Sequence, residues 1–256
     1  MVNALYIAAS GLNAAQQQID VISNNIANMQ TPGFKRARVA FSDVAATTRA
    51  EVEQAGAPLS YTGAGSTVMA TPLSFSEGSL EETGNTYDLA IQGAGFFEVQ
   101  DANGNRLYTR DGQLHVDDQG YLVTANGLRL AHSVQIPPDA TNVKIDAQGQ
   151  ITATLDNNAT ATTLGRIELA AFPAPNGLSS IGNDTFAPTA AAGDPSIGRP
   201  GDPGFGQVQQ GALEMANVNM VSEMASLVIA QRAYQLNARL IQAADQILST
   251  INNLRN

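Results

Sequence analysis

The first thirty residues carry apolar side chains at a regular spacing of seven. One row consists of Leu5, Leu12, Ile19 and Ile26, and a second row three residues further along consists of Ala8, Ala15, Ile22 and Met29. Two such rows on one face form the seam of a coiled-coil helix. Pro32 and Gly33 then end the pattern, because proline lacks the amide hydrogen that a helix needs. The spacing predicts a helix over residues 1–31.

The last forty residues repeat this design. A row at sevenfold spacing consists of Met220, Leu227, Tyr234, Ile241 and Leu248, and Ala230, Ala244 and Ile251 lie three beyond members of that row. Asn219 is a suitable N-cap, and Glu223 stands near the positive end of the helix dipole. Because many seam positions are alanine, neither helix buries much apolar area, and such a helix is marginal alone in water. We expect it to gain order from the other terminal helix and from neighbouring copies.

Between the helices, short β-branched and aromatic runs alternate with Gly, Asn and Asp, which is typical of antiparallel β-structure. The expected strands are 87–92, 95–99, 107–108, 113–116, 121–123, 128–130, 143–145, 151–153 and 167–172, with turns at Asn103-Gly104, Asn126-Gly127 and Gln148-Gly149. Residues 173–211 are rich in Pro, Gly and Ala and predict an irregular path. Residues 44–72 predict an extended arm.

These elements predict an α+β protein in which long terminal helices pair as a coiled-coil-like inner domain beside a mainly antiparallel β middle domain. The inner domain would comprise residues 1–31 and 217–256, the connector 32–80 and the middle domain 81–216. Charge follows the same division. The formal net charge is −10. Residues 46–211 hold 18 acids and 7 bases, whereas both ends are close to neutral.

Composition excludes several kinds of protein. The chain has no Cys, which excludes disulfides and thiolate metal sites. Residues 1–10 are apolar but lack a basic leader, so we expect neither a cleaved secretory signal nor membrane insertion. The one basic cluster, Lys35, Arg36 and Arg38, is too small for a nucleic-acid interface, and we expect no nucleic-acid partner.

No active-site pattern survives inspection. Asp101, Asn103 and Asn105 resemble the start of a calcium loop, but Arg106 occupies the glycine position and Gly112 that of the bidentate glutamate. The sequence offers two histidines and no nucleophile elbow. Acidic pairs such as Asp117-Asp118 and Glu81-Glu82 are more often solvated turns than a glycosidase pair. We therefore expect no catalytic, cofactor or metal site.

Three ordered motifs resemble the flagellar rod and hook protein family. The N-terminal one runs from SGLNA at residues 10–14 through SNNIAN at 23–28 to TPGFK at 31–35. The middle one comprises DLAIQGAGFF at 88–97, YTRDG at 108–112 and GYLVT at 120–124. The C-terminal one comprises ANVN at 216–219, Glu223-Met224 and QRAYQLN at 231–237. Together they span nearly the whole chain.

The resemblance implies a non-enzymatic subunit of a periplasmic helical tube, the rod of the flagellar basal body, which transmits torque to the hook. Length, one compact middle domain and the run from Gly63 to Asp88 fit the distal rod, with a proximal rod subunit as the alternative. The implied partners are copies of the chain, proximal rod and hook proteins along the axis, the surrounding periplasmic and outer-membrane rings, and the flagellar export apparatus. A periplasmic wall-cutting enzyme and an adhesin-like module are competing hypotheses from other classes.

The tube needs helices that touch several neighbours at once. The expected packing residues are Leu5, Leu12, Ile19, Ile22, Ile26, Leu227, Tyr234, Ile241 and Leu248. Their alternative role is pairing within one subunit. Asn24, Asn25 and Asn28 are poor helix formers, and either bond across subunits to fix register or form a solvated stripe. The same alternatives apply to Gln231, Arg232 and Asn237. Pro32, Gly33 and Phe34 predict a corner between helix and arm, with Phe34 and Phe41 as anchors.

Overall fold

The computed structural model describes residues 2–47, 61–132, 134–155 and 158–254 of the chain. These residues form two compact units, and neither unit is continuous in sequence. Unit 1 contains residues 1–27, 37–73 and 219–256, and unit 2 contains residues 28–36 and 74–218. The chain thus passes between the units four times, and each unit is described separately below.

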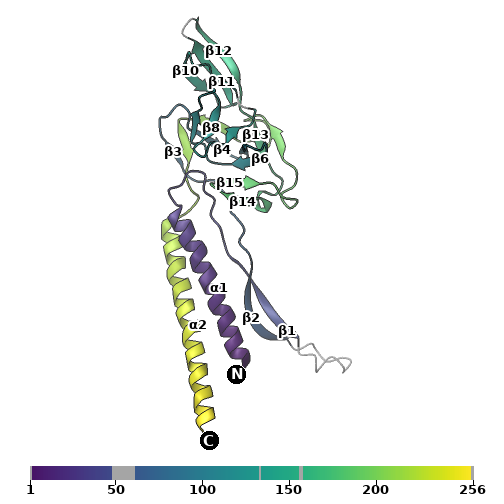
Figure 1. The fold of residues 1–256 in the computed structure, drawn as a ribbon, viewed down its shortest axis with the longest axis vertical. Coiled ribbons are helices and arrows are strands. Elements are labelled where there is room, and N and C mark those ends of the chain that lie inside the picture. The colour runs from purple at the N-terminus through teal and green to yellow at the C-terminus, as the bar shows by residue number, and fades with distance from the viewer. Residues whose placement is uncertain (1, 48–60, 133, 156–157, 255–256) are drawn as a thin grey trace, which may run out of the picture. The chain divides into compact units, whose positions relative to one another are not determined.

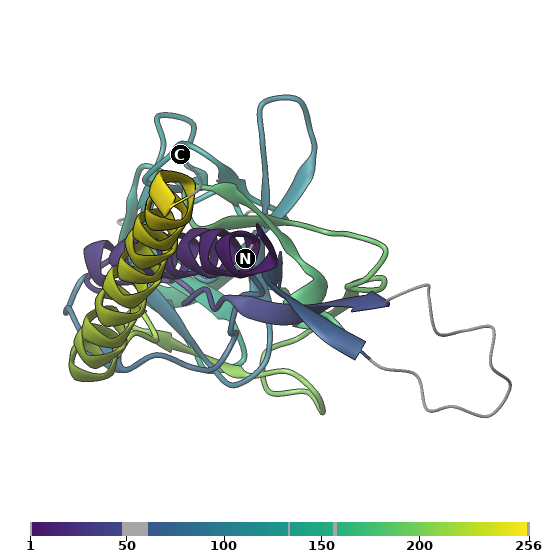
Figure 2. The ribbon, with the colours of Figure 1, turned by 90° about the horizontal axis from the view of Figure 1, so that it is seen from below.

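Unit 1 consists of two long helices and a β-hairpin. Helix α1 is Val2–Ala27 and helix α2 is Met220–Leu254. They lie side by side, and strand β2 packs on α1 (Figures 1 and 2). Asn219 caps α2 as predicted, because its side-chain oxygen accepts a bond of 3.0 Å from the amide of Ser222. Both predicted helices are therefore present, although α1 ends at Ala27, four residues before its predicted end.

The hairpin of unit 1 joins strand β1, Ala40–Thr47, to strand β2, Tyr61–Ala70. The strands are antiparallel, and Phe41 pairs with Val68 and Thr47 with Tyr61. The expectation of an extended arm over residues 44–72 is wrong for the described parts of that range, which are paired strands; residues 48–60 lie outside the described residues. Small and polar residues hid this pairing, because their stabilisation comes from the ladder and from the helix beside it rather than from apolar alternation.

Unit 2 is built from short antiparallel strands. Nine of them form one sheet, with the order β14-β15-β6-β5-β9-β8-β7 and with β13 joining β5 to β16. The members are β5 Phe96–Gln100, β6 Arg106–Thr109, β7 Leu114–Val116, β8 Leu122–Thr124, β9 Arg129–Leu130, β13 Leu169–Ala171, β14 Ser179–Gly182, β15 Thr185–Ala187 and β16 Ser196–Gly198. A short 3-10 helix, Pro175–Gly177, precedes β14.

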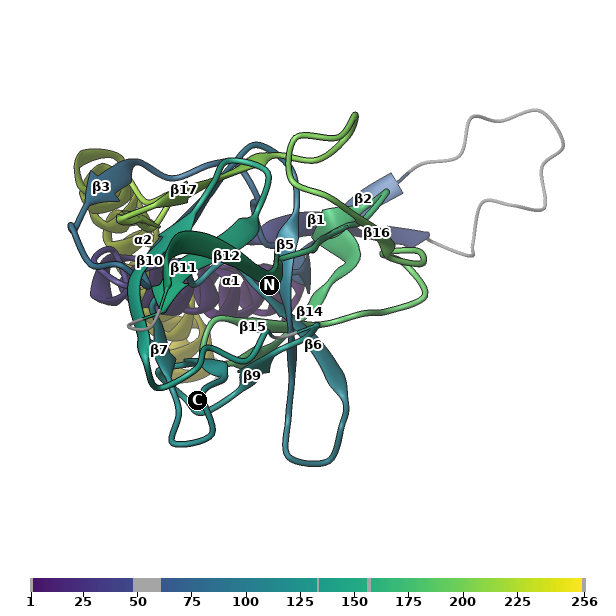
Figure 3. The same ribbon diagram turned by 90° about the horizontal axis from the view of Figure 1, so that it is seen from above.

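The remaining strands of unit 2 form three smaller sheets. Strands β10 Ala140–Ile145, β11 Gln150–Leu155 and β12 Asn158–Arg166 lie side by side (Figure 3). Strand β4, Leu89–Gln92, pairs with β17, Gln207–Gln210, and β3, Leu80–Glu82, pairs with β18, Ala212–Glu214. The last two pairs bring the end of the middle segment back to its beginning.

The apolar core of unit 2 joins these sheets. Leu89, Phe97, Val99, Leu122 and Leu169 are fully buried in one cluster with Ile151 of the smaller sheet. A second group consists of aromatic rings in edge-to-face contact, with Phe96 at 5.4 Å from Phe75 and Tyr108 at 4.8 Å from Phe172. Such ring contacts add to the hydrophobic gain of burial.

The antiparallel β middle predicted from the sequence is confirmed, but the strand list was incomplete. All nine expected ranges contain a strand, although the last also holds the turn before β13. Strand β12 was missed because its sequence, NATATTLGR, is Ala- and Thr-rich and gains order by pairing with β11. The irregular path expected over 173–211 was wrong in part, since β14, β15, β16 and β17 lie there.

Candidate functional site

The α1 face predicted as a seam is the face that this helix buries. Ala8, Ala15 and Ile22 are buried, and Leu5, Leu12, Ile19 and Ile26 are half-buried. In α2, Leu227, Tyr234 and Ile241 are half-buried around the fully buried Ala230. The α2 pattern weakens at its ends, where Met220 is 45% and Leu248 37% exposed. The middle of α2 therefore carries most of its contact with the rest of unit 1.

The two helices approach closely where Gly11 faces Asn237. A Cβ added at Gly11 would lie 2.9 Å from the side-chain nitrogen of Asn237. Any larger residue at position 11 would therefore push the helices apart or displace the amide. Asn237 is half-buried, whereas Gln231 and Arg232, the other polar candidates on α2, are exposed.

Asn25 is the one predicted asparagine that lies in the interior, at 1% exposure. Its amide nitrogen donates to the carbonyl oxygen of Ala37 at 2.9 Å, and its carbonyl oxygen accepts from the amide of Ala37 at 3.0 Å. The same nitrogen lies 3.4 Å from a carboxylate oxygen of Glu223, which is also buried. Asn25 thus binds the end of α1, the chain entering the hairpin and the first turn of α2. Its partners lie within one copy.

The other two asparagines lie nearer the surface. Asn24 is exposed, and Asn28 is half-buried, with its side-chain oxygen 3.4 Å from the hydroxyl of Thr31. A contact of either residue with a second copy stays a prediction.

In unit 2, a buried ionic cluster centred on Glu214 holds three chain segments together. The Lys35 ammonium donates to Glu214 at 2.6 Å and to the carbonyl oxygen of Ser76 at 3.0 Å. The amide of Gly78 donates to the same carboxylate oxygen at 3.0 Å. Both charged side chains are at most 1% exposed. The segments around residues 33–35, 76–78 and 212–214 are therefore joined at one carboxylate.

Arg110 adds a fourth segment to this cluster. Its guanidinium donates to the other oxygen of Glu214 at 3.0 Å and to the carbonyl oxygen of Gly93 at 2.8 Å. It also lies 5.2 Å from the ring centroid of Phe96, a cation–π contact with the aromatic group of the core. One carboxylate thus faces two buried cations, and the net positive charge is compensated by carbonyl dipoles.

Burial lowers the pKa of Lys35, because the charged ammonium loses hydration, and the nearby Glu214 carboxylate opposes that effect. A buried ion pair of this kind is a weak source of net stability, since desolvation offsets much of the attraction. Removing one partner is costly, however, because it leaves the others buried without compensation. The cluster therefore fixes chain path more than it adds stability.

The predicted corner at Pro32, Gly33 and Phe34 lies beside this cluster. Gly33 is buried and has a φ of +75°, a left-handed conformation that glycine adopts at low cost. Its amide donates to the carbonyl oxygen of Glu214 at 2.7 Å, and a Cβ here would lie 2.4 Å from the backbone nitrogen of Asp111. Pro32 and Phe34 are half-buried. Phe41, the other expected anchor, is 46% exposed on β1, so it anchors little within one copy.

Sequence reasoning missed Lys35, Arg110 and Glu214 as a site, although the first two lie inside the quoted motifs TPGFK and YTRDG. The signal was present: a charged residue inside an otherwise apolar or turn-forming motif needs a partner when it is buried. Which acid would serve both cations was not readable, because Glu214 lies more than a hundred residues from each of them.

Two of the acidic motifs dismissed as active sites are turns, whereas the expectation of a turn at Glu81-Glu82 is wrong, since both residues lie exposed on strand β3. The side chain of Asp101 accepts the amides of Asn103 and Asn105, both at 2.8 Å, and so closes the loop between β5 and β6. Asp117 does the same for Gln119 and Tyr121, and these backbone bonds lower its pKa. Within the described ranges, no group of three or more acids and histidines is placed to hold a metal ion, and no helix is long and apolar enough to span a membrane.

Comparison with family models places three segments of the chain. Residues 5–35 match the flagella basal body rod protein model, residues 90–153 the flagellar hook protein FlgE/F/G D1 domain, and residues 209–254 the C-terminal model of flagellar basal body rod FlgEFG proteins. The matched segments follow the order of the three motifs found in the sequence.

Full-length relatives extend the match to the whole chain. The flagellar basal-body rod protein FlgG of Agrobacterium fabrum is 40% identical over 97% of this chain and 98% of its own length. FlgG of Caulobacter vibrioides is 40% identical over 98% of this chain and 99% of its own length. FlgG of Borreliella burgdorferi is 36% identical over 100% of this chain and 99% of its own length.

Proposed function

This chain belongs to the family of flagellar basal-body rod proteins, and from that premise we propose that it polymerises into the helical tube of the distal rod and transmits torque to the hook. The family is one of structural rod subunits, and the wall-cutting enzyme considered from the acidic pairs is not favoured. The proximal rod subunit considered as the alternative within the family is not favoured either, because the full-length relatives from Agrobacterium, Borreliella and Caulobacter are FlgG proteins.

The single observation that carries this proposal is the apolar surface that unit 1 leaves exposed. On α2, Val221 is 78%, Ile229 67%, Leu236 60%, Leu240 59% and Ile247 51% exposed. A helix that presents apolar residues outside its own contact face needs a further partner. Equivalent helices of neighbouring copies supply one in a tube.

In this proposal the terminal helices, residues 1–31 and 217–256, form the inner domain and pair in coiled-coil fashion. Residues 32–80 are the connector, and residues 81–216 form the middle domain. The buried cluster at Glu214 joins residues 33–35 and 76–78, near the two ends of this connector, to the end of the middle domain. Torque applied at one copy is shared among many packed contacts, so no copy turns alone.

We propose that the acidic middle domain forms the outer surface of the tube. The 18 acids against 7 bases of residues 46–211 favour a hydrated exterior that adheres weakly to surrounding rings. Axial neighbours would be proximal rod and hook proteins, and the export apparatus would deliver the chain to the periplasm. These partners follow from the family and from no contact in this structure.

Assembly of a chain that ends at Val218 tests the proposal. We expect purified full-length protein to form tubes at high concentration, visible by electron microscopy, and the chain without α2 to stay monomeric with its β strands folded. Tubes from the truncated chain would contradict the role of the helices.

A full-length variant separates loss of the helix from loss of its apolar surface. Replacing Ile229, Leu236 and Leu240 by serine should raise the concentration needed for assembly at least tenfold, because about 1.5–3 kcal/mol is gained for each large aliphatic side chain that becomes fully buried. The matched control replaces the exposed Gln235, Gln242 and Gln246 by serine. Equal effects of the two triple substitutions would argue against apolar association.

A further inference from the structure

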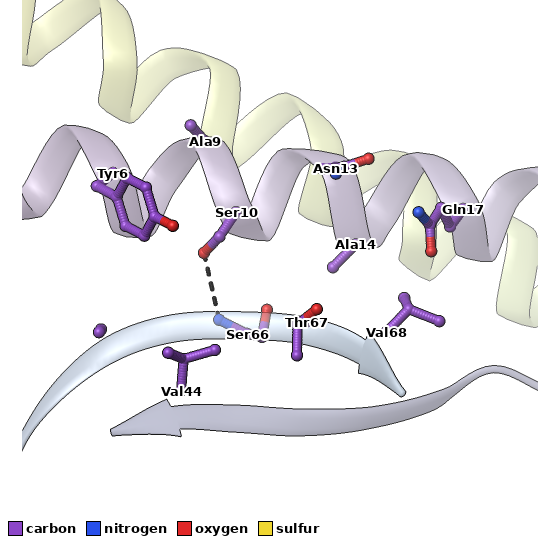
Figure 4. Close-up of a pocket in the computed structure, with 11 residues that line it drawn as sticks. Tyr6, Ala9, Ser10, Asn13, Ala14, Gln17, Val44, Ser66, Thr67 and Val68 are labelled. Atoms are coloured by element: carbon purple, nitrogen blue, oxygen red, sulfur yellow. Dashed lines mark hydrogen bonds between the residues drawn. The ribbon is translucent and has the colours of Figure 1, made fainter. Parts of the chain in front are cut away.

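An open groove lies between α1 and the β-hairpin of unit 1 (Figure 4). Its volume is about 480 Å³, and small residues, among them Ala9, Ser10, Ala14 and Ser66, form much of its wall. The amide of Ser66 donates to the hydroxyl of Ser10 at 3.2 Å, which closes one part of the floor. Tyr6 stands at the edge and is 66% exposed. The groove is therefore accessible from solvent and has room for large side chains.

The groove lies on the side of α1 that faces away from α2. Tyr6, Ser10, Asn13 and Gln17 line it, and at about 100° per residue this row lies roughly 160° around the helix from the seam. In Figure 1, α1 lies between α2 and the hairpin. The α2 helix of the same copy is therefore occupied elsewhere and cannot enter.

The exposed residues of α2 include a second apolar row, Ile229, Leu236, Leu240 and Ile247, which we call the outer row. It lies roughly 110° around α2 from the buried face at about 100° per residue, and each of its members is at least 51% exposed. Leu236 and Ile247 are eleven residues apart, the same separation as Tyr6 and Gln17 in the groove. The ends of the outer row, Ile229 and Ile247, are eighteen residues apart, so its part from Leu236 to Ile247 is the part that matches the groove in length.

Charges beside the two rows are opposite. Asp20 is the one acid of α1, and it continues the groove row by three residues past Gln17. Arg232 and Arg239 are exposed on α2 beside the outer row. Among the residues that the structure describes, none with a charged side chain lines the groove itself. An apolar insertion flanked by Asp20 on one copy and an arginine on the other is electrostatically favourable.

We infer that the outer row of α2 from a second copy of this chain inserts into the groove between α1 and β2. The inference deepens the proposed function and rests on it. A groove on one copy and a row on the next are different surfaces, so the contact is heterologous and leaves a free groove and a free row at the two ends. Such contacts continue into open helical polymers instead of closing as a symmetric dimer.

Single-cysteine cross-linking tests this contact without background, because the chain has no cysteine of its own. One full-length variant carries Asn13→Cys, and a second, with a longer affinity tag, carries Leu240→Cys. The two are mixed under assembly conditions and oxidised, and the mixed disulfide dimer is measured on a non-reducing gel. Each molecule holds one thiol, so every mixed dimer joins two copies.

The matched control pairs Asn13→Cys with Gln242→Cys, since Gln242 is exposed on another face of α2. We expect at least tenfold more mixed dimer with Leu240→Cys than with Gln242→Cys. Equal yields in samples that contain tubes would overturn the inference and leave the proposed function intact. Failure of the unmodified chain to form tubes at any concentration would overturn the proposed function and the inference with it.

Charge reversal tests the orientation of the contact independently. Asp20→Arg alone, or Arg232→Glu with Arg239→Glu, should raise the concentration needed for assembly about two- to fivefold, as expected for exposed ion pairs. All three changes in one chain should restore assembly towards the original concentration. A combined variant that assembles worse than either parent would contradict the proposed pairing.

Discussion

The two units of this chain differ in where they leave their large apolar side chains. Among the described residues, unit 1 exposes fourteen of them and unit 2 three, Leu80, Ile181 and Ile197, although unit 2 is the larger unit. Unit 2 encloses even its charges, since Lys35, Arg110 and Glu214 pair in its interior. The difference teaches that unit 2 buries most of its large apolar side chains within one copy, whereas unit 1 leaves many of them for the contacts with other copies that we propose.

The largest expected loss of stability comes from leaving buried charges of unit 2 without a partner. Glu214→Gln keeps the shape but removes the carboxylate shared by Lys35 and Arg110, and should lower the free energy of unfolding by about 3–5 kcal/mol. Urea unfolding of the full-length chain at low concentration measures it. Glu81→Gln, on the exposed face of the strand paired with β18, is the control and should cost less than about 0.5 kcal/mol. Similar losses of unfolding free energy for both variants would show that the Glu214 cluster matters no more for stability than an exposed acid.

A matched pair of leucines contrasts the two units directly. Leu122→Ala in unit 2 removes a fully buried side chain and should destabilise the monomer by about 2–4 kcal/mol. Leu240→Ala in unit 1, at 59% exposure, should change monomer stability by less than about 0.5 kcal/mol. The same Leu240 variant should assemble less readily in a sedimentation assay. If Leu240→Ala destabilised the monomer as much as Leu122→Ala, unit 1 would be complete without other copies.

Two glycines with almost the same backbone conformation test how tightly the corner at Pro32, Gly33 and Phe34 is packed. Gly33 has a φ of +75° and Gly84 a φ of +73°, but only Gly33 has backbone within reach of an added Cβ. Both alanine variants carry the left-handed strain of about 1–2 kcal/mol. Gly33→Ala should lose about 2 kcal/mol more, from the forced shift at Asp111. Thermal unfolding of both variants measures the difference in stability. Equal losses would mean that the backbone around Gly33 accommodates the added methyl group without further loss of stability.

The sequence predicted the elements whose signal is local and periodic. Heptad rows located α1 and α2, and alternating apolar runs with Gly turns located the strands around Phe97 and Leu122. It failed where order comes from pairing: the strands β1, β2 and β12, which are rich in small residues such as Ala and Thr, are stabilised by their neighbours. The Glu214 cluster was missed for the same reason. Its partners are joined by the fold over long separations, and no local pattern records that a charge is buried.

The smallest expected effect concerns a carboxyl group of unit 2 that is poorly solvated. Asp184 is half-buried and follows Asn183 at a turn where both residues have a φ of 52°. Burial raises its pKa to about 6, and the nearby Asp111 carboxylate acts in the same direction. Burial also raises the pKa of Asp111, and the Asp88 carboxylate acts in the same direction.

The sign of the pH dependence follows from this raised pKa. An acid whose pKa is higher when folded binds more protons in the native state, so its contribution to stability falls as pH rises from about 4 to about 6. The Asp184→Asn variant carries a neutral side chain at every pH, and asparagine adopts the left-handed backbone conformation readily. It should raise the free energy of unfolding by about 1 kcal/mol at pH 7, a figure reduced for partial exposure, and by almost nothing at pH 4. Unfolding curves of both proteins across this range measure it. A gain in the free energy of unfolding that did not depend on pH would come from the turn conformation. It would show that the charge of Asp184 does not destabilise unit 2.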